Sequence, residues 1–453
     1  MSLSIVILAA GKGTRMNSAL PKVLQPLGEQ PLLHHVIETA SQLAPSRICV
    51  VIGHGAEAVR EQTSADVEWV VQAEQKGTGH AVQQALPSIP EDDYVLVLYG
   101  DVPLTRVETM QRLLENTDGI GLLTAEFGDP TGYGRIVREN GAVTAIVEEK
   151  DANAAQKTIT ETNTGIMSGR CGTLRDLLDQ VGCDNAQGEY YLTDVFALAR
   201  AEGLAIHTAQ PDAEWEVLGV NNRDQLEQLE RHLQRNRVQA LLDKGVTVKD
   251  RNRVDIRGSV TTGRDVVLDV GVVLQGDVTL EDGVVVGPYC VISDSHIKAG
   301  TVLQPHCVVE RAEVGAASKV GPFARLRPGA TLAGRNHVGN FVEIKNAQIG
   351  EGSKVNHLSY VGDADLGERV NIGAGTITAN YDGVNKHRTV LGDDVSTGSN
   401  SVLVAPIRVG AGTTVGAGST LTKDVEAGAL VYTRAPTRVR TDWVSPKKKA
   451  AKG

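Results

Sequence analysis

The stretch 254–290, VDIRGSVTTGRDVVLDVGVVLQGDVTLEDGVVVGPYC, carries an apolar side chain at every sixth position. These positions are Val254, Val260, Val266, Val272, Val278, Val284 and Cys290. An α-helix repeats every ~3.6 residues and a strand every two, so neither element gives this spacing. A period of six is typical of a hexapeptide β-helix, in which each repeat forms a short strand and turn with one side chain pointing inward. The stretch therefore predicts a parallel β-helix.

The same spacing returns twice further along the chain. One series is Val320, Leu326, Leu332, Val338 and Ile344, and the other is Leu391, Thr397, Leu403, Val409, Val415 and Leu421. A coil of a β-helix buries its apolar face only against its neighbours, so a stable helix needs many coils in succession. The repeats indicate a β-helix that fills most of 250–430.

Residues 1 to about 222 follow a different pattern, in which short apolar runs alternate with amphipathic segments. The runs are SIVILAA (4–10), RICVVIG (47–53), VEWVVQ (67–72), YVLVLYGD (94–101) and GIGLLTAEF (119–127). The amphipathic segments include PLLHHVIETASQLA (31–44) and TGHAVQQALPSI (78–89). This alternation predicts a Rossmann-like α/β domain with a mostly parallel sheet.

The sequence divides into four segments. We expect an α/β domain over 1–222, a connecting helix over 223–245, the β-helix over 246–445, and a disordered basic tail over 446–453. The helix is predicted from the stripe Leu226, Leu229 and Leu233 and from Gly245, which is a common helix terminator.

Composition restricts the classes of partner and the compartment. The net charge is -10, which argues against nucleic acid or a membrane surface as the main partner. The chain has five cysteines and no C-x-x-C pair, which favours reduced thiols in the cytosol over disulfides or a zinc site. No apolar stretch reaches transmembrane length, and the N-terminus lacks a signal-peptide pattern. We therefore expect a soluble cytoplasmic protein.

A glycine-rich turn follows the first predicted strand, in ILAAGKGTRMNSALPKVL (7–24). Gly11 and Gly13 are too close for a Walker A motif, and Met16 replaces the third glycine of the dinucleotide fingerprint. The turn nevertheless lies where ligands of open α/β sheets bind, and its N–H groups can form an anion nest. Arg15 and Lys22 add positive charge. The stretch predicts a phosphate site of another kind.

Motifs in the first half resemble those of the sugar-nucleotide pyrophosphorylases. They are LAAGKGTRM (8–16), LPK (20–22), QAEQKGTGHA (72–81), YGDVPL (99–104), GYGRI (132–136), VEEKDA (147–152), NTGI (163–166) and GVNNR (219–223). Combined with the hexapeptide half, the chain is similar to the bifunctional bacterial enzymes of UDP-N-acetylglucosamine synthesis. In these, an N-acetylglucosamine-1-phosphate uridylyltransferase is fused to a glucosamine-1-phosphate N-acetyltransferase with a left-handed β-helix. Their product feeds peptidoglycan and lipopolysaccharide synthesis.

The resemblance implies a uridylyltransferase site in the first half. Lys22 and Arg15 would be catalytic, neutralising the transferring and leaving phosphates, and Asp101 and Asn221 would hold Mg²⁺. Residues implied to bind UTP or the UDP-sugar are Leu8, Ala9, Ala10, Gly11, Lys22, Gln72, Gly77, Thr78, Tyr99, Gly100, Asp101, Gly134, Glu148, Asn163 and Asn221. Within VEEKDA only the motif register selects Glu148 over Glu149.

The second half would hold the acetyltransferase site. The segment Ala379–Thr389 has no six-residue phase and is predicted to be an inserted loop, which solenoids commonly use for function. His357, in VNHLSY, would be the general base, since imidazole titrates near neutral pH. The resemblance implies a sugar-phosphate site of Arg327, Lys345, Tyr360, Asn371, Asn380 and Lys386. It implies an acetyl-CoA site of Ala374, Tyr381, Ser399, Ala417 and Arg434, with the N–H of Ala374 stabilising the oxyanion. It also implies a homotrimer with sites between subunits.

Two other functions are open to this sequence. One is a sugar-1-phosphate nucleotidyltransferase whose β-helix is only a scaffold, and the other is a non-catalytic sensor that retains a nucleotide-binding fold. The interrupted hexads around His357 argue against the scaffold. The presence of Asp101, Lys22 and Arg15 argues against the sensor.

Overall fold

The computed structural model describes residues 2–185 and 187–444. The backbone forms two compact units, one ending at Leu233 and the other beginning at Gln234, so that helix α7 (Arg223–Asp243) belongs partly to each. The predicted boundaries at 222 and 245 stay predictions, and the predicted basic tail lies outside the described residues. Each unit is described by itself below.

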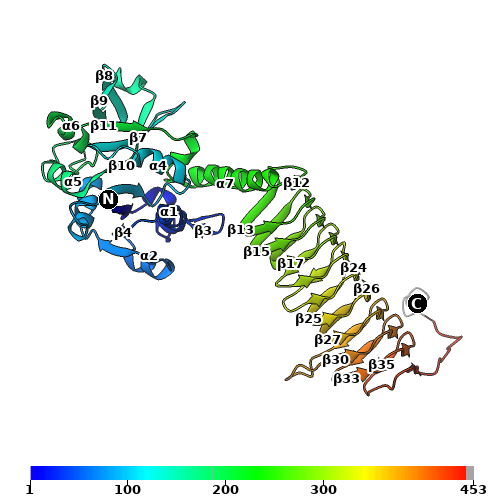
Figure 1. Cartoon of the computed structure of the whole chain (residues 1–453). Coiled ribbons are helices and arrows are strands. Elements are labelled where there is room, and N and C mark those ends of the chain that lie inside the picture. Colours follow the sequence, from blue (N-terminus) through cyan, green and yellow to red (C-terminus); the bar gives the residue numbers. More distant parts are fainter. Residues whose placement is uncertain (1, 186, 445–453) are drawn as a thin grey trace, which may run out of the picture. The chain divides into compact units, whose positions relative to one another are not determined.

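The first unit is built on one mixed sheet with the order β11-β7-β10-β6-β1-β4-β5 (Figure 1). Its parallel strands are β1 (Leu3–Ala9), β4 (Arg47–Ile52), β5 (Glu68–Val71) and β6 (Tyr94–Tyr99), together with the parallel pair β7 (Ile120–Glu126) and β11 (Ile206–Ala209). Strand β10 (Glu161–Arg170) runs antiparallel between β6 and β7. The hairpin β8 (Arg135–Glu139) and β9 (Ala142–Val147) extends from β10, and β2 (Pro26–Leu27) pairs with β3 (Gln30–Pro31). The α/β prediction is confirmed.

Helices cover both faces of this sheet. They are α1 (Leu32–Ser41), α2 (Ala56–Gln62), α3 (Thr78–Ala85), α4 (Val107–Leu114), α5 (Cys171–Leu178) and α6 (Asp194–Ala201). In β1, Val6 and Leu8 pack with residues of α3, α5 and α6, whereas Ile5 and Ile7 pack with residues of α1, α2 and α4. A strand buried on both faces must be apolar at every position, which is why these segments are uniform hydrophobic runs.

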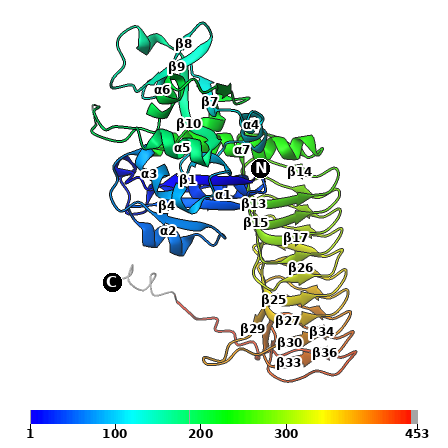
Figure 2. The same cartoon turned by 60° about the vertical axis from the view of Figure 1, so that its left-hand side comes forward.

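The second unit is a parallel β-helix, as the hexads predict (Figures 1 and 2). One sheet contains β12 (Thr247–Val248), β14 (Val267–Leu268), β16 (Val285–Val286), β18 (Val302–Leu303), β21 (Lys319–Val320), β24 (His337–Asn340), β26 (Lys354–His357), β28 (Asn371–Ile372), β31 (Ser396–Thr397), β34 (Thr414–Val415) and β36 (Leu430–Val431).

The other sheet contains two sets of strands. The first is β13 (Val254–Thr262), β15 (Val272–Leu280), β17 (Val291–Ile297), β19 (Val308–Glu310), β22 (Arg325–Leu326), β25 (Glu343–Ile349), β27 (Tyr360–Leu366), β29 (Ile377–Ala379), β32 (Val402–Val404) and β35 (Thr420–Leu421). The second is β20 (Glu313–Val314), β23 (Thr331–Leu332), β30 (Thr389–Leu391) and β33 (Ile407–Val409).

The hexad side chains lie in the core of the β-helix, together with further buried residues such as Ile256, Leu268, Leu274 and Val286. Val254 pairs with Val272 in the next coil, a spacing of 18 residues, or three hexads. Nearly all predicted hexad residues are buried, and Val260 alone among them is only partly covered. Each coil thus buries its apolar residues against the coils above and below it.

The predicted loop is confirmed as a hairpin between β29 and β30, closed by a bridge between Tyr381 and Lys386. Lys354 pairs with Asn371, 17 residues on, whereas Asn371 pairs with Ser396, 25 residues on. The longer step accommodates the hairpin without disturbing the stack. No described helix has both the length and the apolar character needed to cross a membrane.

Candidate active sites

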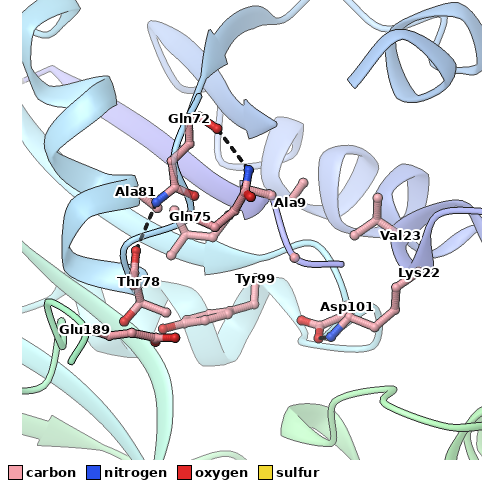
Figure 3. A pocket seen from close by; sticks show the side chains of 14 residues that line it. Ala9, Lys22, Val23, Gln72, Gln75, Thr78, Ala81, Tyr99, Asp101 and Glu189 are labelled. Atoms are coloured by element: carbon pink, nitrogen blue, oxygen red, sulfur yellow. Dashed lines mark hydrogen bonds and ion pairs between the residues drawn. The ribbon is translucent and has the colours of Figure 1, made fainter. Parts of the chain in front are cut away.

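A cavity of about 290 Å³ lies at the carboxyl edge of the first unit's sheet (Figure 3). It is lined by Leu8, Ala9, Ala10, Gly11, Lys22, Val23, Gln72, Gln75, Gly77, Thr78, Ala81, Tyr99, Asp101 and Glu189. A Cβ atom placed on Gly11 would meet no atom within 4 Å, so the turn borders open space. The cavity thus has backbone amide groups and free room at the place where a phosphate is predicted.

Four predicted residues meet at one side of this cavity. The Lys22 ammonium forms an ion pair with the Asp101 carboxylate and lies 3.3 Å from Asn221 Oδ1. Arg15 Nη2 donates to the same Asn221 oxygen at 3.0 Å. The N–H of Val220 donates to the carbonyl of Asp101 at 2.9 Å and so holds Asn221 beside it. Two cationic and two oxygen-bearing side chains therefore converge from segments far apart in the sequence.

The glycine turn is shaped to receive Lys22. Gly13 has a φ of 59°, and a Cβ atom there would lie 2.5 Å from Lys22 Cβ. Only glycine tolerates both the left-handed conformation and this contact. Gly100, by contrast, does not line the cavity: its N–H donates to the Leu8 carbonyl at 2.9 Å, and its Cα packs against neighbouring side chains.

The loop after β5 closes the far side of the cavity. Gln72 is buried, and its Nε2 donates to the Gly77 carbonyl at 3.1 Å. A Cβ atom on Gly77 would lie 2.6 Å from the Tyr190 carbonyl oxygen, so the loop fits closely against 189–190. Gln72 and Gly77 thus define the shape of this wall.

Glu148, Gly134 and Asn163 form a second group next to the cavity. A Cβ atom on Gly134 would lie 3.5 Å from the Glu148 carboxylate oxygens, and the Asn163 N–H donates to the Gly134 carbonyl at 2.8 Å. Burial raises the pKa of Glu148, although a hydrogen bond from Thr193 Oγ1 at 3.2 Å acts in the opposite direction. Burial, and then the charges on Glu148 and Asp101, raise the pKa of Tyr99. The charges of both groups therefore act on Tyr99.

Three polar residues at this site were not predicted from the sequence. Gln75 lines the cavity and belongs to the QAEQKGTGHA motif, so its membership of that motif is a signal in the sequence that could have identified it. Glu189 and Thr193 come from a segment without any motif, and only the fold brings them to Thr78 and Glu148.

In the second unit, three predicted cations gather on one face of the β-helix. The Lys386 ammonium lowers the pKa of Lys345, and Arg327 adds to the effect. Arg327 also donates to Glu343 at 2.7 Å. Like charges this close create a strong attraction for an anion.

Polar residues surround these cations. Asn380 Nδ2 lies 3.4 Å from the Tyr360 hydroxyl and donates to Asp363. Asp363 accepts a second hydrogen bond, from Asn346 Nδ2 at 2.5 Å. Neither Asp363 nor Asn346 was predicted, although Asn346 follows Lys345 directly. The face offers donors and acceptors next to positive charge.

His357 lies at a corner of the coil, at the end of β26. Its Nδ1 is 3.2 Å from Asn340 Oδ1, one coil earlier in the register. The Gly375 N–H donates to the His357 carbonyl at 3.0 Å, which places the turn containing Ala374 beside it. In the described part of the chain, the Ala374 N–H has no backbone hydrogen-bond acceptor, whereas its carbonyl accepts from Asn400. The turn that contains this amide N–H thus lies beside the backbone of His357.

The predicted acetyl-CoA residues continue along the same corner. Asn400 donates to Ala374, and Gly418 donates to Ser399, so that Ala374, Ser399 and Ala417 occupy equivalent turns of successive coils. Tyr381 is exposed on the hairpin, and Arg434 lies over the Tyr432 ring. Asn371 is exposed on β28, and no described contact joins it to His357. Nor does any described contact within the chain join His357 to the Arg327–Lys345–Lys386 group.

The fold and the two sites define a nucleotidyltransferase domain joined to a hexapeptide-repeat transferase domain. Residues 5–248 match the MobA-like NTP transferase domain, and residues 388–423 match the bacterial transferase hexapeptide repeat. A nucleotidyl transferase structure from Methanothermobacter covers 52% of the chain and 99% of its own, with 18% identity and a TM-score of 0.39.

Full-length relatives identify the family. The bifunctional protein GlmU of Pseudomonas putida strain GB-1 is 56% identical, with 99% of each chain covered. That of Burkholderia thailandensis is 57% identical over 99% of this chain and all of its own. The chain belongs to the bifunctional GlmU family. It is a bifunctional enzyme with nucleotide and acyl substrates. Its membership of this family favours two activities over a single nucleotidyltransferase activity with a structural β-helix.

Proposed function

We propose that the two sites catalyse consecutive reactions. The β-helix transfers the acetyl group of acetyl-CoA to the amine of glucosamine 1-phosphate. The α/β unit then transfers a uridylyl group from UTP to the N-acetylglucosamine 1-phosphate, releasing pyrophosphate and forming UDP-N-acetylglucosamine. The observation that carries the proposal is that a chain of the bifunctional family has a polar site around Lys22 and, on its β-helix, both His357 and a separate group of cations.

Uridylyl transfer depends on positioning and charge neutralisation more than on covalent chemistry. The cavity beside Gly11 receives the triphosphate, and Lys22 and Arg15 lie where they can neutralise its charge. Leu8, Ala9, Ala10, Gln72, Gly77 and Thr78 form the wall for uridine. The sugar phosphate binds at Gly134, Glu148 and Asn163, next to Tyr99, with its phosphate oxygen toward the α-phosphorus.

A magnesium site at Asp101 and Asn221 fits the side chains. Both oxygens contact the single Lys22 ammonium, so they converge on one point, and both are ligands of the kind that Mg²⁺ prefers. No group of three His, Cys, Asp or Glu side chains capable of holding a metal occurs among the described residues. Phosphate and water oxygens would complete the coordination. When bound, the ion stabilises negative charge on the reacting phosphates.

Acetyl transfer uses the corner around His357. The imidazole removes a proton from the sugar amine as the amine attacks the thioester, and the Ala374 N–H donates to the oxygen that becomes negative. Arg327, Lys345 and Lys386 hold the phosphate, and Tyr360, Asn371 and Asn380 contact the sugar. Tyr381, Ser399, Ala417 and Arg434 lie along the acetyl-CoA arm.

We propose that three copies of the chain assemble through their β-helices in the cytoplasm. Each acetyltransferase site would combine His357 of one subunit with the cation group of another. The lack of a described contact between these groups within one chain supports this arrangement.

The division of labour is tested with two variants. His357→Ala should lower acetyl transfer by about 10²- to 10⁴-fold, the usual contribution of a general base, without changing pyrophosphate release. Asp101→Ala should lower pyrophosphate release without changing acetyl transfer. The assays are release of the CoA thiol with acetyl-CoA and glucosamine 1-phosphate, and release of pyrophosphate with UTP and N-acetylglucosamine 1-phosphate. No sugar-dependent thiol release from the folded wild-type protein would refute the second activity.

A further inference from the structure

The Lys22 side chain occupies the place proposed for the metal ion. Its ammonium contacts both the Asp101 carboxylate and Asn221 Oδ1, and only 14% of the Lys22 side chain and 16% of the Asp101 side chain are exposed. An ion pair that is this well covered is screened much less than one on the surface. The two oxygens proposed to bind the metal are therefore already paired with a cation of the protein itself.

An ammonium and a divalent cation cannot share these two oxygens. A cation bound to both oxygens would lie where the Lys22 nitrogen now lies, and the two positive charges would repel each other strongly at this separation. Lys22 must therefore leave before the ion enters. Leaving is unfavourable unless another anion receives the ammonium.

The nucleotide supplies that anion. Lys22 lines the same cavity as Gly11, where the open space lies, so its ammonium can reach a triphosphate without any movement of the backbone. The backbone is well fixed: the Gln25 N–H donates to the Lys22 carbonyl at 3.1 Å, and Gly13 packs against Lys22 Cβ. Only the side chain beyond Cβ needs to rotate.

We propose that Lys22 is an internal counter-ion of the metal site, which keeps divalent cations off Asp101 and Asn221 until the triphosphate draws its ammonium away. The inference rests on the proposed metal site. It makes metal entry dependent on the nucleotide and gives Lys22 a role before phosphate transfer begins.

Titration of the full-length protein with Mn²⁺, without nucleotide, tests the inference. Free Mn²⁺ is followed by electron paramagnetic resonance. Lys22→Met keeps the length of the side chain and removes its charge, and Lys12→Met removes the same charge from an exposed position in the same turn. We expect Lys22→Met to bind Mn²⁺ at least about tenfold more tightly than wild type, because a site that is open about a tenth of the time binds about tenfold more weakly. Lys12→Met should behave like wild type.

A non-hydrolysable UTP analogue provides the second arm. With it, wild type should bind Mn²⁺ tightly and the advantage of Lys22→Met should shrink. Equal Mn²⁺ binding by wild type and Lys22→Met without nucleotide, or no binding by either, would overturn the inference.

Asp101→Asn separates this failure from a failure of the proposed site. If Asp101→Asn keeps the Mn²⁺ binding that wild type shows beyond chelation by the analogue alone, the proposed metal site is wrong. If it loses that binding while Lys22→Met gains nothing, only the counter-ion role is wrong. Thermal unfolding of each variant verifies that it is folded.

Discussion

At the scale of single residues, Glu148 and Glu149 show how the fold separates neighbours that the sequence leaves equivalent. Glu149 forms an ion pair with Arg135 at 2.7 Å, whereas Glu148 is partly buried beside Gly134 and accepts a hydrogen bond from Thr193. A partly buried carboxylate whose described partner is a neutral hydroxyl is costly, which points to a ligand. The hydroxyl groups of a sugar would provide the missing donors.

The raised pKa of Glu148 has a consequence for stability. An acid whose pKa is higher in the folded state binds its proton more tightly there, so the free energy of unfolding falls as pH rises from the ordinary value through the raised one. Glu148→Gln has no such charge. It should therefore unfold at a higher temperature than wild type at pH 8, and the difference should disappear in acid, below both pKa values.

The same variant should bind the sugar phosphate poorly. Loss of hydrogen bonds to a charged group corresponds to an increase of about tenfold to a hundredfold in KM. Thermal unfolding between pH 4 and 8 and the pyrophosphate assay together measure both effects. A lower unfolding temperature for Glu148→Gln at pH 8 would contradict this account of the site.

At the scale of elements, one carboxylate makes several of the bonds that hold the hairpin between β29 and β30. Asp382 accepts from the N–H groups of Val384 and Asn385 at 2.8 and 2.7 Å and pairs with His387 at 2.7 Å. These bonds, chiefly that from the Asn385 N–H, lower the pKa of Asp382 to about 2. The stabilisation is complete above the ordinary value and is lost as pH falls toward 2. At neutral pH, the hairpin thus positions Tyr381 and Lys386 firmly.

Asp382→Ala should loosen the hairpin and weaken acetyl transfer selectively. We expect KM for glucosamine 1-phosphate to rise about tenfold, since several hydrogen bonds of ~1 kcal/mol each are lost around Lys386. Uridylyl transfer should not change. Val384→Ala, at the exposed tip of the same hairpin, is the matched control and should resemble wild type. Equal effects of the two substitutions would exclude a special role for Asp382.

The coils themselves offer another matched pair. On β16, Val286 is fully buried in the core, whereas its neighbour Val285 is partly exposed. Val286→Ala removes two methyl groups from the core and should cost roughly 2 kcal/mol, at ~0.8 kcal/mol per buried methylene plus a term for the cavity. Val285→Ala should stay within about 0.5 kcal/mol of wild type. Urea unfolding of both variants measures the difference, which should vanish if the inward-facing side chains of β16 do not form part of the core.

The elements were easier to predict from the sequence than the sites. A hexad repeats one local rule in every coil, and the strands of the sheet are uniformly apolar because both faces are buried, so both patterns are visible in short windows. Glu189 and Thr193 reach their site through the contact of Gly77 with Tyr190, more than a hundred residues away in the chain. A pattern within a short stretch of sequence cannot indicate a contact between residues so far apart. The roles of Lys22, Asp101 and His357 rested on the family resemblance, and the structure adds the neighbours that make those roles chemically reasonable.

At the scale of the whole molecule, the central question is how His357 and the cation group of Arg327, Lys345 and Lys386 meet. His357 ends β26 in one sheet of the β-helix and Lys345 lies on β25 in the other, and the described contacts do not connect His357 with the cation group within one chain. Assembly of three copies would solve this problem by placing the histidine corner of one β-helix against the cation face of another. Such a cyclic arrangement uses the same contact three times.

Mixing of two inactive variants tests this arrangement. His357→Ala and Lys345→Ala should each lack acetyl transfer. If a site takes these residues from different subunits, each mixed trimer contains one intact site. Random mixing by unfolding and refolding should then restore about a quarter of wild-type activity, because about three quarters of such trimers are mixed. Light scattering verifies the trimer. No recovery from mixed trimers would place both residues of a site in the same subunit.

The pairing of Val254 with Val272 also governs which changes in gene length the β-helix tolerates. Loss or duplication of the codons for one complete coil leaves every remaining hexad in phase, so the stack can close over the change. Loss of a few codons within a coil turns inward-facing positions outward through the rest of that coil. Insertions are tolerated instead at corners, as the hairpin after Ala379 illustrates. Length variation among members of the family should therefore occur in whole coils or at corners, and rarely within a strand.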